Sequence, residues 1–197
     1  MIRQRGNIIG MIGILALGLL VQGSALAAPP GTPLRLVAFA INLNSTHPGR
    51  SSGIVEIVIE RWSSEEERGA LLTALHQGGQ DALLKALQKA PRVGYIRTPD
   101  SIAWDLHYAH QRPDSNGGQR IFLGTDRRIA FWESFNNTRS LDYPFTLVEL
   151  HLGANGRGDG QLSIATKITE GTDGHYLHLE DYSAEPVRLQ DVHTETK

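Results

Sequence analysis

Polar and apolar positions alternate with a period of two along residues 53–62, the clearest pattern in the chain. Val55, Ile57 and Ile59 fall on one side of this stretch, whereas the opposite side carries glutamates. Such alternation is typical of a half-buried β-strand. An apolar run over residues 34–43 precedes it, separated by a segment rich in Ser, Pro and Gly. We therefore expect the two strands to pair as a hairpin.

The hydrophobic period changes to that of a helix directly after this second strand. Ser63 or Ser64 can cap a helix, and Glu66 or Glu67 three residues later would complete a capping box. Leucines recur at helical spacing on both sides of Gly78-Gly79, and a proline follows the second stretch. These features predict a helical hairpin over residues 64–90.

From residue 92 onward the chain shows short apolar stretches separated by turn residues. The predicted strands cover residues 93–97, 102–110, 120–124, 128–135, 145–152, 161–169, 175–182 and 187–193. In the strand over 102–110, Trp104, Leu106 and Tyr108 are expected to share one face. No β-α-β alternation is present. The pattern predicts a mainly β (α+β) fold, an antiparallel β-sandwich or partly closed β-barrel of about nine strands with one inserted helical hairpin.

The beginning of the chain has the three parts of a secretory signal peptide. Arg3 and Arg5 precede an apolar run over residues 8–21, and Ala25-Leu26-Ala27 supplies the small residues that a signal peptidase requires. We expect cleavage between Ala27 and Ala28 and a periplasmic or secreted protein. The predicted organisation is a signal peptide over 1–27, a flexible leader over 28–33, a single β-rich domain over 34–193 and a tail over 194–197.

Composition excludes several classes of protein. The chain has no cysteine, which excludes thiol catalysis, disulfides and a lipoprotein anchor. Its formal net charge is −2, and it has no basic stripe with interleaved aromatic residues. We therefore expect no nucleic-acid partner. No second long apolar segment follows the signal sequence, so we expect no membrane anchor after cleavage.

Carboxylates and imidazoles share one face on each of three predicted strands. Their convergence could hold a divalent metal such as zinc or form an acid/base pair. The alternative is a solvated sheet face, because exposed faces of antiparallel sheets are normally polar. The residues concerned are Asp105, His107, Glu149, His151, His178 and Glu180.

Aromatic and arginine side chains lie on three predicted strands that follow the helical hairpin, over residues 93–97, 102–110 and 128–135. They could line a ligand pocket between the sheet and the hairpin, with an apolar wall and a few polar anchors. The alternative is that the aromatic residues belong to the core. The residues concerned are Tyr95, Arg97, Trp104, Tyr108, Arg128 and Trp132.

The glycine-rich segment 153–160 contains the tripeptide Arg157-Gly158-Asp159, which adhesion receptors read. A phosphate loop is excluded, because strands are predicted on both sides and such a loop needs a following helix. We expect a hairpin loop that displays this tripeptide at its tip. The simplest explanation for the many glycines is that a hairpin loop needs residues that accept positive φ.

Four stretches together resemble an uncharacterised family of exported bacterial proteins that has no assigned activity. They are residues 53–62 (Gly-Ile-Val-Glu-Ile-Val-Ile-Glu-Arg-Trp), 78–84 (Gly-Gly-Gln-Asp-Ala-Leu-Leu), 91–99 (Pro-Arg-Val-Gly-Tyr-Ile-Arg-Thr-Pro) and 142–147 (Asp-Tyr-Pro-Phe-Thr-Leu). The resemblance implies a bacterial envelope setting and no transferable catalytic residue.

These observations favour an exported, non-catalytic binding module for a small apolar ligand or an envelope partner, with no cofactor specified. Two alternatives remain open from the sequence. One is a metal-assisted or acid/base hydrolase that uses the carboxylates and imidazoles named above. The other is a purely structural or protein-interaction module, which would present a contiguous exposed apolar patch.

Overall fold

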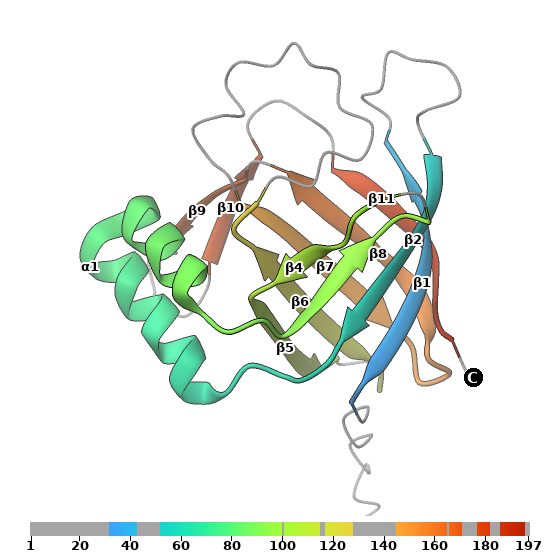
Figure 1. Ribbon diagram of the computed structural model, residues 1–197. Helices are drawn as coiled ribbons and strands as arrows, with labels where there is room; N and C mark the ends of the chain where they lie inside the picture. The colour runs from blue at the N-terminus through green and yellow to red at the C-terminus, as the bar shows by residue number, and fades with distance from the viewer. Residues whose placement is uncertain are drawn as a thin grey trace, which may run out of the picture.

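Nine antiparallel strands form one sheet that curves around a shared core and nearly closes into a barrel (Figure 1). The computed structural model describes residues 32–42, 52–99, 101–114, 117–127, 145–164, 166–170, 177–181 and 186–195; it does not describe the side chains of 164, 166–170 and 177–181. The predicted signal peptide, the strand predicted over 128–135, Arg128 and Trp132 lie outside these residues. The predicted mainly β, antiparallel fold with a helical hairpin is confirmed.

The strands follow one another across the sheet in the order β4-β3-β2-β1-β11-β8-β7-β6-β5. Two further strands form a separate pair, β9 (Thr166–Glu170) and β10 (Leu177–Asp181). The strands of the large sheet are β1 (Leu34–Ile41), β2 (Ser52–Ile59), β3 (Gly94–Arg97), β4 (Trp104–Leu106), β5 (Tyr108–Pro113), β6 (Gln119–Thr125), β7 (Thr146–Leu152), β8 (Arg157–Ile164) and β11 (Val187–Thr194).

The two edge strands of this sheet, β4 and β5, are consecutive in the chain and are separated only by His107. The backbone N–H of His107 donates to the carbonyl of Gly124 in β6 at 2.9 Å. Leu106 and Ala109 are both fully buried in the core, three residues apart, so the alternation changes phase between them. The single strand predicted over 102–110 is therefore wrong. Tyr108 does not share the face of Leu106, because this break turns its side chain towards the helix.

The interior of the sheet is filled with apolar side chains. Alternate residues of each strand point inward, as the period of two predicts. Leu36 in β1, Ile57 in β2 and Leu150 in β7 all have zero exposure, and Trp62 and Trp104 pack against this core. Burial of this kind, at about 25 cal/mol per Å² of apolar surface, stabilises a chain that has no disulfide.

The helical hairpin begins at a capping box and turns at a glycine. In α1 (Glu65–Lys89), the Ser64 hydroxyl accepts from the Glu67 N–H at 3.1 Å, and the Glu67 carboxylate accepts from the Ser64 N–H at 2.9 Å. Gly79, with φ 64° and ψ −151°, interrupts the helix and divides it into two segments. Positive φ favours glycine at this position.

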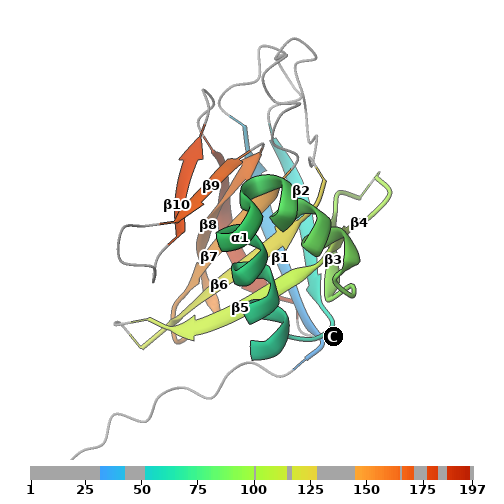
Figure 2. The same ribbon diagram turned by 90° about the vertical axis from the view of Figure 1, so that its left-hand side faces the viewer.

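In Figure 2 the hairpin lies in front of the strands and covers their outer face. Leu71, Leu83 and Leu87 of α1 are buried together with Phe145, and Tyr108 and Leu147 pack against them. This cluster is separate from the core inside the sheet. The sheet and the hairpin therefore share a small apolar interface.

The second half of the glycine-rich segment 153–160 is a strand. The turn covers 153–156, and β8 begins at Arg157. Asp159 pairs with His151 in β7, and Arg157 pairs with His193 in β11. The tripeptide at 157–159 therefore lies inside the sheet between two strands, and the predicted display at a hairpin tip is wrong.

Candidate functional site

A polar groove lies on the outer face of four neighbouring strands, β6, β7, β8 and β11, and has a volume of about 610 Å³. We call it the outer groove. The alternation that points Val148, Leu150 and Leu152 of β7 inward places Glu149 and His151 on the outside. The groove is lined by Arg120, Glu149, His151, Asp159, Gly160, Gln161, Arg188, Leu189 and Gln190.

Glu149 lies at the centre of the polar contacts in the groove. Its Oε1 is 2.9 Å from His151 Nε2, which donates to it, and 3.5 Å from Nη1 of Arg120. Its Oε2 accepts from Gln161 Nε2 at 3.4 Å. Donors from three neighbouring strands thus converge on one carboxylate, which is itself only one-fifth exposed.

Arg120 connects this carboxylate to a second one at the end of β5. Its Nε is 3.7 Å from Oδ1 of Asp114, while its Nη1 reaches Glu149. Within the part of the chain that the structure describes, Arg120 Nε is buried and has no hydrogen-bond partner. The guanidinium is therefore held in place mainly by charge.

Asp159 faces His151 across the β7–β8 pairing and is exposed. Arg188 projects from β11 on the other side of β8, at a position paired with Gln161. Two guanidinium groups and two carboxylates therefore line the groove, so its formal charge is zero with histidine counted as neutral.

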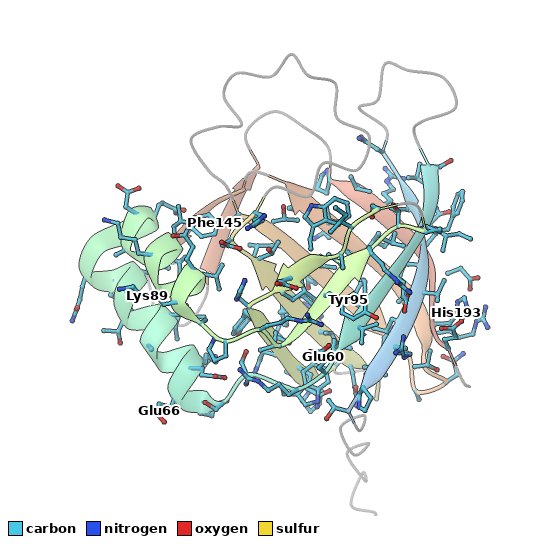
Figure 3. The ribbon with its side chains drawn as sticks, in the orientation of Figure 1. Glu60, Glu66, Lys89, Tyr95, Phe145 and His193 are labelled. Carbon is cyan, nitrogen blue, oxygen red and sulfur yellow. The ribbon has the colours of Figure 1, made fainter. Side chains whose placement is uncertain are left out.

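The four predicted ligand residues that the structure describes lie in three different surroundings. Tyr95 and Arg97 lie on β3, outside the barrel and apart from the outer groove. Two guanidinium groups lie over the Tyr95 ring, with Cζ of Arg92 and of Arg97 5.4 Å and 5.7 Å from its centroid. Arg97 Nε also donates to Glu56 at 2.6 Å. Figure 3 shows Tyr95 near Glu60 on the strands, to the right of Lys89 of α1.

Trp104 and Tyr108, the other two, each belong to an apolar cluster. Trp104 packs against the core inside the sheet, whereas Tyr108 packs against the helical hairpin. Burial raises the pKa of Tyr108, and the ring of His110 stacks beside it with centroids 6.4 Å apart. Burial, together with the positive charge of Arg68, lowers the pKa of His110.

The described members of the predicted metal set form two groups with different partners. Asp105 is 3.5 Å from Arg92, and His107 binds the Ala90 carbonyl through Nδ1 at 2.9 Å. Glu149 and His151 contact each other in the outer groove. The side chains of His178 and Glu180 lie outside the description. Among the residues whose side chains are placed, no three His, Asp or Glu form a metal-binding group.

Sequence reasoning paired Glu149 with His151 but missed the other groove residues. Arg120, Gln161 and Arg188 are polar positions on the outer faces of neighbouring strands, and the sequence contains that signal. Strand order and register bring them to Glu149, and β11 lies beside β8 although β9 and β10 separate them in the chain.

Comparison with models of known families, with curated proteins and with solved structures finds no match for this chain. Among the described residues, no helix combines the length and the hydrophobicity that a membrane-spanning helix requires.

Proposed function

We propose that this chain is an exported, non-catalytic binding module that recognises an envelope partner through the outer groove. The export rests on the signal sequence, and the bacterial envelope setting rests on the family resemblance. The groove supplies the contact surface.

The contrast between the interior of the barrel and its outer face carries this proposal. The inward positions are occupied by buried apolar side chains from every strand of the large sheet. The outer groove instead presents charged and amide side chains over a volume of about 610 Å³. This distribution favours a polar partner on the outside over a small apolar ligand, because the expected place of that ligand between the sheet and the hairpin holds the buried side chains of Leu71, Leu83, Leu87 and Phe145.

The contacts of Glu149 favour binding over catalysis. A general acid or base needs a carboxylate that is available to a substrate proton. Glu149 already accepts from His151 and Gln161 and lies beside Arg120. Such a network holds side chains in a fixed arrangement, which lowers the entropic cost of binding a partner.

The contact between His151 and Glu149 also favours a second candidate, an acid/base hydrolase. Many enzymes use as general base a histidine whose imidazole is oriented by a carboxylate, and here Oε1 of Glu149 lies 2.9 Å from Nε2 of His151. A groove enzyme would release shorter products from an envelope polymer, detected by mass spectrometry, and His151→Ala would abolish the release. A binding module leaves the polymer intact.

Co-sedimentation with isolated cell envelopes tests the proposed function. We expect the purified protein to sediment with the envelopes in a saturable manner. Arg188→Ala removes a charged hydrogen-bond donor from the groove and should weaken this binding about tenfold. Arg97→Ala is the matched control, because Arg97 is also an exposed arginine of the sheet but lies outside the groove, and it should leave the binding unchanged. Wild-type protein that stays in the supernatant, or equal binding by the two variants, would overturn the proposal. Intact-mass measurement of the same protein should place its first residue at Ala28.

A further inference from the structure

The outer groove has a balance of charge that selects against strongly charged ligands. Arg120 and Arg188 would repel a cation, and Glu149 and Asp159 would repel an anion. Because the two positive and the two negative charges sum to zero, the groove has no net charge that would attract an ion of either sign. The electrostatics of the groove therefore favour a neutral ligand.

Hydrogen-bond donors and acceptors are interleaved across the groove. Guanidinium groups only donate, carboxylates only accept, and the amides of Gln161 and Gln190 do both. A ligand that satisfies this mixture must itself donate and accept at closely spaced positions. Hydroxyl groups on neighbouring carbons have that property, because each hydroxyl carries one donor and two acceptor sites.

One carboxylate in the groove is available for such a ligand. Asp159 is exposed and has no side-chain hydrogen bond or ion pair in the described part of the chain. It lies opposite His151, whose ring is fixed by Glu149. A hydroxyl bound here would donate to Asp159 without displacing an existing contact.

The dimensions of the groove suit an extended ligand. It crosses four neighbouring strands, which at about 4.8 Å per strand corresponds to roughly 14 Å. The strands β6, β7, β8 and β11 lie side by side in Figure 1. A ligand with repeated units can lie across them and contact the side chains of each strand in turn.

We infer that the ligand of the outer groove is a neutral, hydroxyl-rich glycan segment. This inference rests on the proposed function and specifies the class of envelope partner. Asp159 accepts from sugar hydroxyls, Arg188 donates to them, and the amides of Gln161 and Gln190 bridge neighbouring hydroxyls.

Titration of ¹⁵N-labelled protein with defined probes tests the ligand class. The probes are the neutral oligosaccharides maltohexaose, cellohexaose and chitohexaose, the polyanion inorganic polyphosphate, and the neutral peptide hexaglycine. We expect at least one oligosaccharide to shift the amide resonances of Glu149, Asp159 and Gln161. Gln161→Ala should raise the Kd about three- to tenfold, the loss of one or two hydrogen bonds. Gln88→Ala, an exposed glutamine of α1, should leave the Kd unchanged.

The outcomes separate this inference from the proposed function. Groove resonances that respond to polyphosphate or to hexaglycine but to no oligosaccharide would overturn the glycan assignment. A complete lack of response to the three oligosaccharides would also overturn it. In both cases co-sedimentation that depends on Arg188 would still support an envelope-binding module. Failure of that sedimentation would overturn the function itself.

Discussion

His151 lies two residues beyond Glu149 on the outer face of β7, and its Nε2 is 2.9 Å from Oε1 of Glu149. The residue between them, Leu150, is fully buried in the core. One alternating strand thus supplies both the packed interior and the polar groove. Because these side chains project from a paired strand and not from a loop, the groove is a preformed surface.

Two isoleucines of β2 provide a matched test of where the stability comes from. Ile57 has zero exposure, whereas Ile54 on the same strand is 53% exposed. Ile57→Ala should lower the free energy of unfolding by about 2–5 kcal/mol, because it removes buried contacts and leaves a cavity. Ile54→Ala should change it by less than about 0.5 kcal/mol. Urea denaturation of both variants measures the difference, and equal values would contradict the assigned core.

Gly158 occupies a position where β7 and β8 approach too closely for a side chain. A Cβ there would overlap the carbonyl oxygen of His151. Gly158→Ala should destabilise the protein by about 3 kcal/mol, the upper end of typical overpacking costs. Gly69→Ala in α1 meets nothing within 4 Å and should stabilise it by about 0.5–1 kcal/mol. The midpoint temperature of thermal unfolding should therefore fall for Gly158→Ala and rise for Gly69→Ala.

The capping box predicts a graded response at Ser64. Ser64→Ala removes the acceptor for the Glu67 N–H and should cost about 1 kcal/mol, whereas Ser64→Gly should cost only a few tenths. Chemical denaturation, followed by circular dichroism at a helical wavelength, measures both. If the alanine variant proved as stable as wild type, the cap would contribute nothing to the hairpin.

His110 predicts a loss of stability in mild acid. Its pKa is lowered in the folded protein by burial and by Arg68 and Arg112, with Glu65 opposing them. Just below pH 6.5, the usual pKa of histidine, the unfolded chain therefore binds more protons than the folded protein does. Stability should be full above that pH and should fall as the pH decreases towards the folded pKa. Denaturation curves of wild type and His110→Gln between pH 5 and pH 7.5 measure this slope; a slope unchanged by the substitution would assign it to other groups.

Much of the fold follows from periodicity alone. The period of two in β2 and β7 and the helical period around Gly79 were sufficient to predict an antiparallel sheet with a helical hairpin. The break at His107 could not be predicted, because apolar residues continue to alternate through it while the chain passes from one sheet edge to the other.

Residues 157–160 belong to β8, although their glycine content led to the prediction of a loop. Glycines normally indicate a loop, but here β8 is enclosed between β7 and β11. A Cβ at Gly158 or Gly160 would meet the backbone of β7, so the glycines are what allows the strand to fit. The site was predicted only in part for a similar reason. Local spacing pairs Glu149 with His151, but the approach of Arg120 and Gln161 depends on long-range register.

The most direct test of the envelope-binding account compares the outer groove with the interior in one titration. The protein, labelled at backbone amides and at Ile and Leu methyl groups, is titrated with solubilised envelope polymer and, separately, with palmitate as an apolar probe. We expect the polymer to shift the amides of Glu149, His151 and Gln161, and neither probe to shift the methyl groups of Leu36, Ile57 and Leu150. Methyl shifts inside the barrel with palmitate, and an unperturbed groove with the polymer, would contradict the account.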